Sequence, residues 1–231
     1  MTPKPSFLFK DFLRAAIREG RKTQTRRVLS PANTLIDGRA PKKGEWEQLD
    51  LAHAWIDPSP SPAGNPGPYF KVDNIVTGTG HRLYPRAQPG DVWYMREPLL
   101  QSLKGQTLYA DDGNYAYRRD ENHNGSPMWL YAHDTLSSML MPAWAARTFM
   151  LVLRVWPVRI QDIGEEDAMA EGFRGAAFGD GPNGSEGILP SDQFATAWDS
   201  INARRPGCGW ADNPPVWAFE WKLTTKDEAN R

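Results

Sequence analysis

The sequence predicts an α+β fold in which short β-strands outnumber a few peripheral helices. Runs rich in Val, Trp, Tyr and Phe recur along the chain, and turn residues separate them. Helical periodicity is confined to a few stretches. Glycine and proline occur 20 times each, which indicates frequent loops. This pattern favours a small barrel or a strongly bent sheet with attached helices, and residues 1–231 are expected to form a single domain.

The first third of the chain is expected to be mostly irregular after one helix. Apolar residues at helical spacing place that helix within 6–20, with Ser6 or Pro5 at its start and Gly20 as a left-handed C-terminal cap. Residues 31–88 are expected to form a long, mostly irregular segment, because "DPSPSPAGNPGP" (57–68) can continue neither a helix nor a strand. One short strand is expected at 69–76.

The remaining elements are read mainly as strands. They are expected at 92–97, 106–112, 115–120, 127–134, 148–163 and 213–223. Residues 141–147 form a short helix or turn. The acids of "GEEDAMAEGF" suit the first turn of a short helix at 164–173. A helix at 191–204 has Ser191 or Asp192 as N-cap and presents Phe194, Trp198 and Ile201 on one stripe.

Composition narrows the function classes. Cys208 is the only cysteine, which excludes an internal disulfide framework and a cysteine-based zinc site. The four histidines lack metal-ligand spacing, and neither a membrane span nor a signal peptide is indicated. We therefore expect a cytoplasmic protein without metal or cofactor, and the sequence leaves its oligomeric state open.

The net charge of −1 conceals two oppositely charged segments. Residues 1–30 hold eight Lys/Arg against two Asp/Glu, and residues 157–200 hold nine Asp/Glu against two Arg. Either one face attracts phosphate, or the two segments neutralise each other in the fold.

The basic stretch "REGRKTQTRRV" (18–28) contains the first candidates for chemistry. A lysine with a lowered pKa can accept the proton of a threonine hydroxyl, and Lys22 and Thr25 could form such a pair. Arg21, Arg26 and Arg27 could supply the cationic surroundings. The alternative is an exposed basic turn.

Glu171 and Trp210 are further candidates. A carboxylate in the last turn of a helix opposes the helix dipole, so Glu171 either has a partner or is a solvated acid. Trp210 lies in a loop between small residues, where it could offer a binding surface. The Gly-rich segment 175–187 lacks the pattern of a phosphate loop and reads as a lid or a plain loop.

The stretch "EGRKTQTRR" resembles the signature of the ASCH superfamily, whose members adopt PUA-like folds. Gly20, Lys22, Thr25 and Arg27 match that signature. Segments at 7–30, 88–97, 147–173 and 194–221 resemble long ASCH-like proteins of bacteriophages and prophages, and together they cover 89 of the 231 residues. The resemblance implies a PUA-type β-barrel beside a cleft, with insertions near 31–88, 101–145 and 173–190.

One ASCH member removes the acetyl group from N4-acetylcytidine with a Lys, Thr and Glu set. By resemblance, Lys22, Thr25 and Glu171 are catalytic here. We further expect Arg21, Arg26 and Arg27 to hold phosphate or a carbonyl oxygen, a tryptophan or tyrosine to stack on the base, and Trp210 to belong to the binding surface. The implied function is an amidohydrolase of N4-acylated cytidine or a related modified pyrimidine nucleoside, free or in nucleic acid, with RNA favoured over DNA. The alternatives are a noncatalytic reader of RNA or of modified bases and a ribonuclease.

Overall fold

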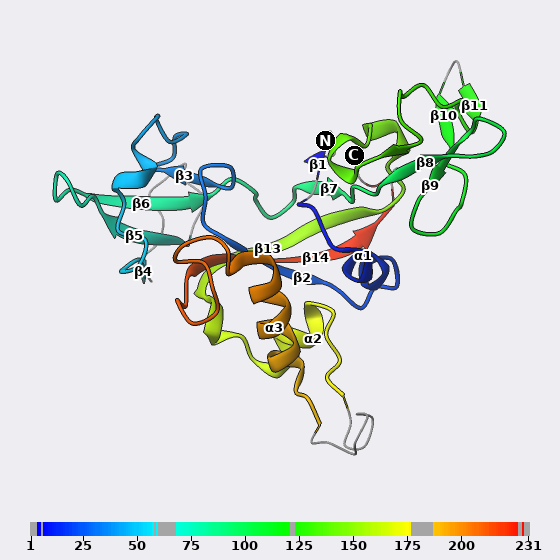
Figure 1. Ribbon diagram of the computed structural model, residues 1–231. Helices are drawn as coiled ribbons and strands as arrows, with labels where there is room; N and C mark the ends of the chain where they lie inside the picture. Colours follow the sequence, from blue (N-terminus) through cyan, green and yellow to red (C-terminus); the bar gives the residue numbers. More distant parts are fainter. Residues whose placement is uncertain are drawn as a thin grey trace. The chain divides into compact units, whose positions relative to one another are not determined.

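The computed structural model describes residues 4–5, 7–57, 59, 68–120, 123–176, 187–225 and 228 (Figure 1). Strands dominate a mixed α and β arrangement with few helices. The chain divides into two compact units. The first contains Met1–Gly20, Asp91–Leu151 and Lys222–Arg231, and the second contains Arg21–Gly90 and Val152–Trp221. Among the residues described, no helix combines the length and apolar character that crossing a membrane requires.

Over its described residues, the first unit contains the helix α1, short strands and single-turn helices. Its elements are β1 (Lys4–Pro5), α1 (Asp11–Arg18), β7 (Val92–Tyr94), β8 (Leu99–Gln101), β9 (Thr107–Tyr109), β10 (Arg118–Asp120), β11 (His123–Gly125), β12 (Thr135–Leu136), η2 (Ser138–Leu140) and η3 (Ala143–Ala145). β7 pairs parallel with β1 and antiparallel with the start of β13. β12, β8 and β9 form a three-stranded sheet, and β10 pairs with β11. The unit's core includes Tyr94, Leu99, Tyr109 and Phe149.

The second unit contains the candidate site. Its elements are β2 (Gln24–Val28), β3 (Thr34–Ile36), η1 (Trp46–Gln48), β4 (Trp55–Asp57), β5 (Tyr69–Asp73), β6 (Gly80–Pro85), most of β13 (Phe149–Arg159), η4 (Ile160–Asp162), α2 (Glu165–Ala170), α3 (Pro190–Asn202) and most of β14 (Pro215–Thr224). β14 pairs antiparallel with β2. Apolar residues of α2 and α3 pack against β14 through a cluster that includes Ala168, Phe194, Trp198 and Val216 (Figure 1).

The expectation that 31–88 is irregular is wrong. β3, β6, β5 and β4 form a four-stranded antiparallel sheet in this segment, and β5 is the strand expected at 69–76. Its core face carries Phe70, Leu83 and Ile36, each 0% exposed. The strands have three to six residues, too few for a clear alternation, and pairings such as β3 with β6 join residues far apart in sequence.

Several expected boundaries and one strand also differ from the structure. The first helix begins at Asp11 and not at Ser6 or Pro5, although Gly20 does adopt a left-handed φ of 73°. Residues 127–134 form no regular strand, and β10 pairs instead with β11. The N-cap of α3 is Leu189, because Pro190 occupies the first turn of the helix. Proline lacks a backbone N–H, and in the first turn that group would have no acceptor within the helix. Ile201 is exposed, and the neighbouring Asn202 is buried in its place.

Candidate active site

Lys22 is buried two residues before the start of β2. The residue is 1% exposed, and its ammonium donates hydrogen bonds to three oxygens. Nζ lies 2.7 Å from the carbonyl of Gln24, 2.9 Å from the carbonyl of Glu171 and 2.5 Å from Glu171 Oε2. An ammonium has three N–H donors, so these acceptors match its donor number. Residues 149 positions apart are therefore joined through one amino group.

Glu171 links two buried cations. It is the C-cap residue of α2 and is 3% exposed. Its Oε2 pairs with Lys22, and its Oε1 lies 3.3 Å from Arg26 Nη1. Arg26 Nη2 in turn lies 2.6 Å from Asp167 Oδ2. The carboxylate that opposes the dipole of α2 thus has compensating cations from β2 and the residues before it.

The surroundings make Lys22 a weaker base than a lysine in water. Burial lowers the pKa of Lys22 to about 8, because desolvation disfavours the ammonium. The charge and the hydrogen bond of Glu171 oppose that shift, while the charges of Arg27 and Arg26 add to it. Burial also lowers the pKa of Arg27, to about 10, against the opposing charge of Glu171. The amino group can therefore exchange protons near neutral pH.

Thr25 lies on one face of the β2–β14 pair. It is 2% exposed and is paired with Phe219, while Arg27 is paired with Trp217. Alternation along the strands puts Thr25, Arg27, Phe219 and Trp221 on one face, and Gln24 and Arg26 on the other. Lys22 Nζ lies 5.8 Å from the centre of the Trp221 ring. Glu171 meets Lys22 and also reaches Arg26 on the opposite face.

The other predicted binding residues are placed differently. Arg21 is half-buried and directly precedes Lys22. Trp210 packs against the α2–α3 cluster: its ring meets Phe194 edge to face at 6.1 Å, and its backbone N–H donates to Asp199 Oδ1 at 2.6 Å. Trp210 thus contacts α3, and its carbonyl accepts hydrogen bonds from Gln161 of η4 at 2.8 Å and from Asn213. None of these contacts in the described part of the chain is with the Lys22 network. Most of the Gly-rich segment 175–187, namely 177–186, lies outside the described residues.

Sequence reasoning assigned neither Gln24 nor Asp167 to the site, and it named Trp221 only within a group of aromatic candidates. Two spacings could have found the first two. Asp167 is four residues before Glu171, so both side chains lie on one side of α2. Gln24 is two residues before Arg26 in β2, so their side chains point to the same face of the strand. Gln24 Oε1 lies 3.3 Å from Arg26 Nη1. Trp221 has no local signal, because its proximity to Lys22 depends on the register of β14 with β2.

Within the described ranges, no group of three His, Cys, Asp or Glu side chains is arranged to hold a metal ion. Comparison with known proteins adds no relative, since no protein-family model, curated protein or solved structure matches this chain.

Proposed function

We propose that this protein is a PUA-like, ASCH-type amidohydrolase that removes the acyl group from N4-acylated cytidine or a related modified pyrimidine nucleoside, free or in RNA. The observation that carries the proposal is the buried Lys22–Glu171 pair. The resemblance of "EGRKTQTRR" to the ASCH signature assigns these two residues to one catalytic set, and they are in direct contact although 149 positions separate them. A cytoplasmic location fits such a substrate.

The reaction is an amide hydrolysis in two steps. Neutral Lys22 takes the proton of Thr25 while Oγ1 attacks the acyl carbon, and the C–N bond then breaks as the protonated Lys22 gives that proton to the leaving amine. The resulting acyl ester on Thr25 is cleaved by water, which regenerates the hydroxyl and releases the carboxylic acid. Glu171 holds Lys22 in place throughout, and Arg27 offers charge on the same face as Thr25.

A lysine with a pKa of about 8 suits the role of base. At pH 7.5, roughly a quarter of such a group is neutral, whereas an ordinary lysine is almost entirely charged. The rate should therefore rise with pH and level off above about 8. Glu171→Gln should move this rising limb to lower pH, because the Glu171 carboxylate raises the pKa of Lys22.

The test is chromatographic detection of cytidine released from N4-acetylcytidine and from a panel of N4-acylated cytosines. Wild type should release it, while Lys22→Met, Thr25→Val and Glu171→Gln should lose at least about a hundredfold in rate. Glu97→Gln is the matched control, because Glu97 is a carboxylate with a side chain 0% exposed that binds two arginines in the first unit. Equal loss in the control would mean that damage to the fold explains the effect.

A noncatalytic reader of RNA or modified bases is the second candidate. The observation that favours it is the saturation of the Lys22 ammonium by three protein acceptors, which suits a structural cation. A reader would bind RNA with strong salt dependence and keep its affinity in Thr25→Val. Cleavage of labelled RNA by wild type but not by Lys22→Ala would instead identify a ribonuclease.

A further inference from the structure

A separate pocket of about 420 Å³ lies in the second unit, at the opposite end of β2 from Lys22. Five segments line it: the end of β2, the stretch 46–52, the end of β13, the loop after α3 and the residues before β14. Lys22 precedes Val28 by six positions, and the residues that line the pocket include none of the hydrogen-bond partners of Lys22. The pocket therefore belongs to a site other than the one around Lys22.

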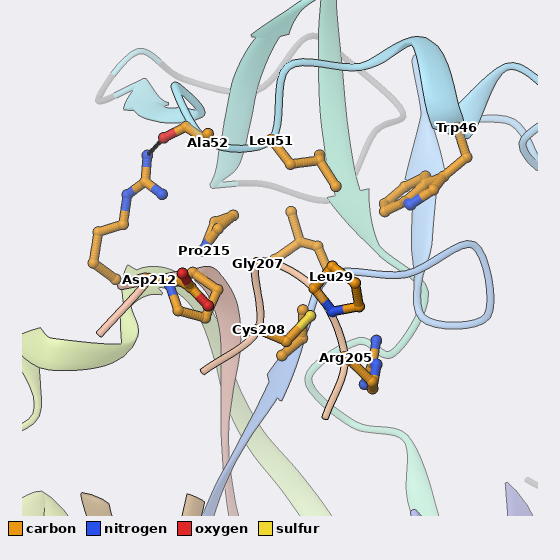
Figure 2. A pocket seen from close by; sticks show the side chains of 13 residues that line it. Leu29, Trp46, Leu51, Ala52, Arg205, Gly207, Cys208, Asp212 and Pro215 are labelled. Atoms are coloured by element: carbon orange, nitrogen blue, oxygen red, sulfur yellow. Dashed lines mark hydrogen bonds between the residues drawn. The ribbon is translucent and has the colours of Figure 1, made fainter. Parts of the chain in front are cut away.

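The walls of this pocket are apolar and include one aromatic ring. Figure 2 shows Trp46 and Leu51 on one side, facing Leu29 and Cys208 on the other. Trp46 is half-buried at the start of η1. A volume of a few hundred Å³ with apolar walls and a few polar groups is typical of small-molecule sites. The indole offers a flat surface for a planar ring.

The polar groups of the pocket are mainly cationic. Arg159 and Arg205 contribute two positive charges against the single carboxylate of Asp212. Asp212 Oδ2 accepts the backbone N–H of Gly209 at 2.9 Å. Arg159 is fixed by backbone carbonyls, since its Nη2 donates to Ala52 at 2.8 Å (Figure 2) and also to Ala54 at 2.5 Å. These two hydrogen-bond partners are neutral, and the carboxylate of Asp162 is the nearby negative charge that acts on Arg159.

Arg205 is the group available to a ligand. It is exposed, and within the described part of the chain no carboxylate forms an ion pair with it. Both Arg205 and Trp46 line the pocket, and Figure 2 shows Trp46 above Leu29 and Arg205 below it. A guanidinium there can donate two parallel hydrogen bonds to a phosphate or carboxylate. A planar group and an anionic group of one molecule could thus be held together.

We propose that this pocket binds a small ligand in which a planar ring carries one anionic group, with the ring against Trp46 and the phosphate or carboxylate on Arg205. The chemical class is that of aromatic and heteroaromatic phosphates and carboxylates, among which nucleoside monophosphates are included. The proposal does not depend on catalysis at Lys22, because the two sites share none of their contact residues.

The only cysteine provides a direct test. Cys208 lines the pocket and is 8% exposed, so its reaction with a thiol reagent reports whether the pocket is filled. Phenyl phosphate, benzoate and cytidine 5′-monophosphate would be compared with inorganic phosphate and cytidine. Ring-bearing anions should slow the reaction in a saturable manner, by fivefold or more. Inorganic phosphate and cytidine should slow it much less at equal concentration. Comparing the protection given by phenyl phosphate with that given by benzoate shows whether the pocket prefers a phosphate or a carboxylate.

Matched variants sharpen the result. Arg205→Gln should weaken binding of the anions about tenfold or more, whereas Arg204→Gln, its exposed neighbour outside the pocket, should not. Trp46→Leu should weaken ring binding about tenfold, and Trp55→Leu should leave it unchanged. Calorimetric titration with phenyl phosphate provides a second readout. The Lys22→Met variant should bind phenyl phosphate as wild type does. The absence of saturable binding at millimolar concentration, or equal effects of Arg204→Gln and Arg205→Gln, would overturn the proposal.

Discussion

Replacing Glu171 by glutamine should destabilise the second unit strongly, because Glu171 compensates two buried cations. The side chains of Lys22, Arg26 and Glu171 are 0%, 1% and 4% exposed. Removing one partner of a buried ion pair typically costs about 3–5 kcal/mol of folding free energy. Glutamine keeps the volume and one acceptor oxygen, so a loss of about 3 kcal/mol is expected. The pKa of Lys22 should also fall below its present value of about 8, because Glu171 raises it.

Urea unfolding followed by tryptophan fluorescence measures this loss. Asp167→Asn is the matched control: it removes another carboxylate from Arg26, but its side chain is 35% exposed and Arg26 retains Glu171. Solvent screening limits its cost to about 1 kcal/mol or less. The double variant Lys22→Met with Glu171→Gln should cost less than the sum of the two single changes, because the pair is then removed together. A Glu171→Gln loss no greater than that of Asp167→Asn would refute the reasoning.

Three further outcomes are expected from unfolding experiments. Relative to Lys22→Met, wild type should gain up to about 3 kcal/mol between pH 8 and pH 10.5, because the unfolded state holds the lysine proton more tightly than the folded state, whose pKa is about 8; a flat or falling difference would contradict this. Gly20→Ala should cost about 1 kcal/mol and Gly20→Asn less, because φ is 73° there while a Cβ would meet no atom within 4 Å; equal costs would contradict it. Glu97→Gln should cost about 3–5 kcal/mol, since Arg147 and Arg18 both pair with its buried carboxylate, yet it should leave hydrolysis of N4-acetylcytidine intact.

Elements with strong local patterns could be predicted from the sequence. β13 falls within its expected strand, and β14 matches its expected strand except that it extends to Thr224, because both are long and rich in Val, Trp and Phe. α2 was found from its acidic first turn, and the position of Glu171 at its end left two alternatives, a carboxylate with a partner or a solvated acid. The short sheet of 31–88 could not be found in this way, because its strands depend on partners distant in sequence and on packing such as that of Phe70 against Trp217.

Contacts between residues distant in sequence also explain why only part of the candidate site could be predicted. Lys22, Thr25 and Glu171 were named from a short signature and a helix end, and burial of the lysine agrees with the environment that lowers its pKa. Asp167 and Trp221 join the network through tertiary contacts. Trp210 could not be assigned from its loop position, because packing on Phe194 is decided by how the loop folds onto α3. The pocket around Trp46 required five segments to converge, which no local pattern encodes.

The most direct test of the central claim is release of cytidine from N4-acetylcytidine at pH 8 by wild type and by Lys22→Met in parallel, with unfolding curves for both proteins. The account predicts cytidine from wild type and at least about a hundredfold less from a folded Lys22→Met variant. Release by both proteins at equal rates, or by neither protein while both are folded, would contradict it.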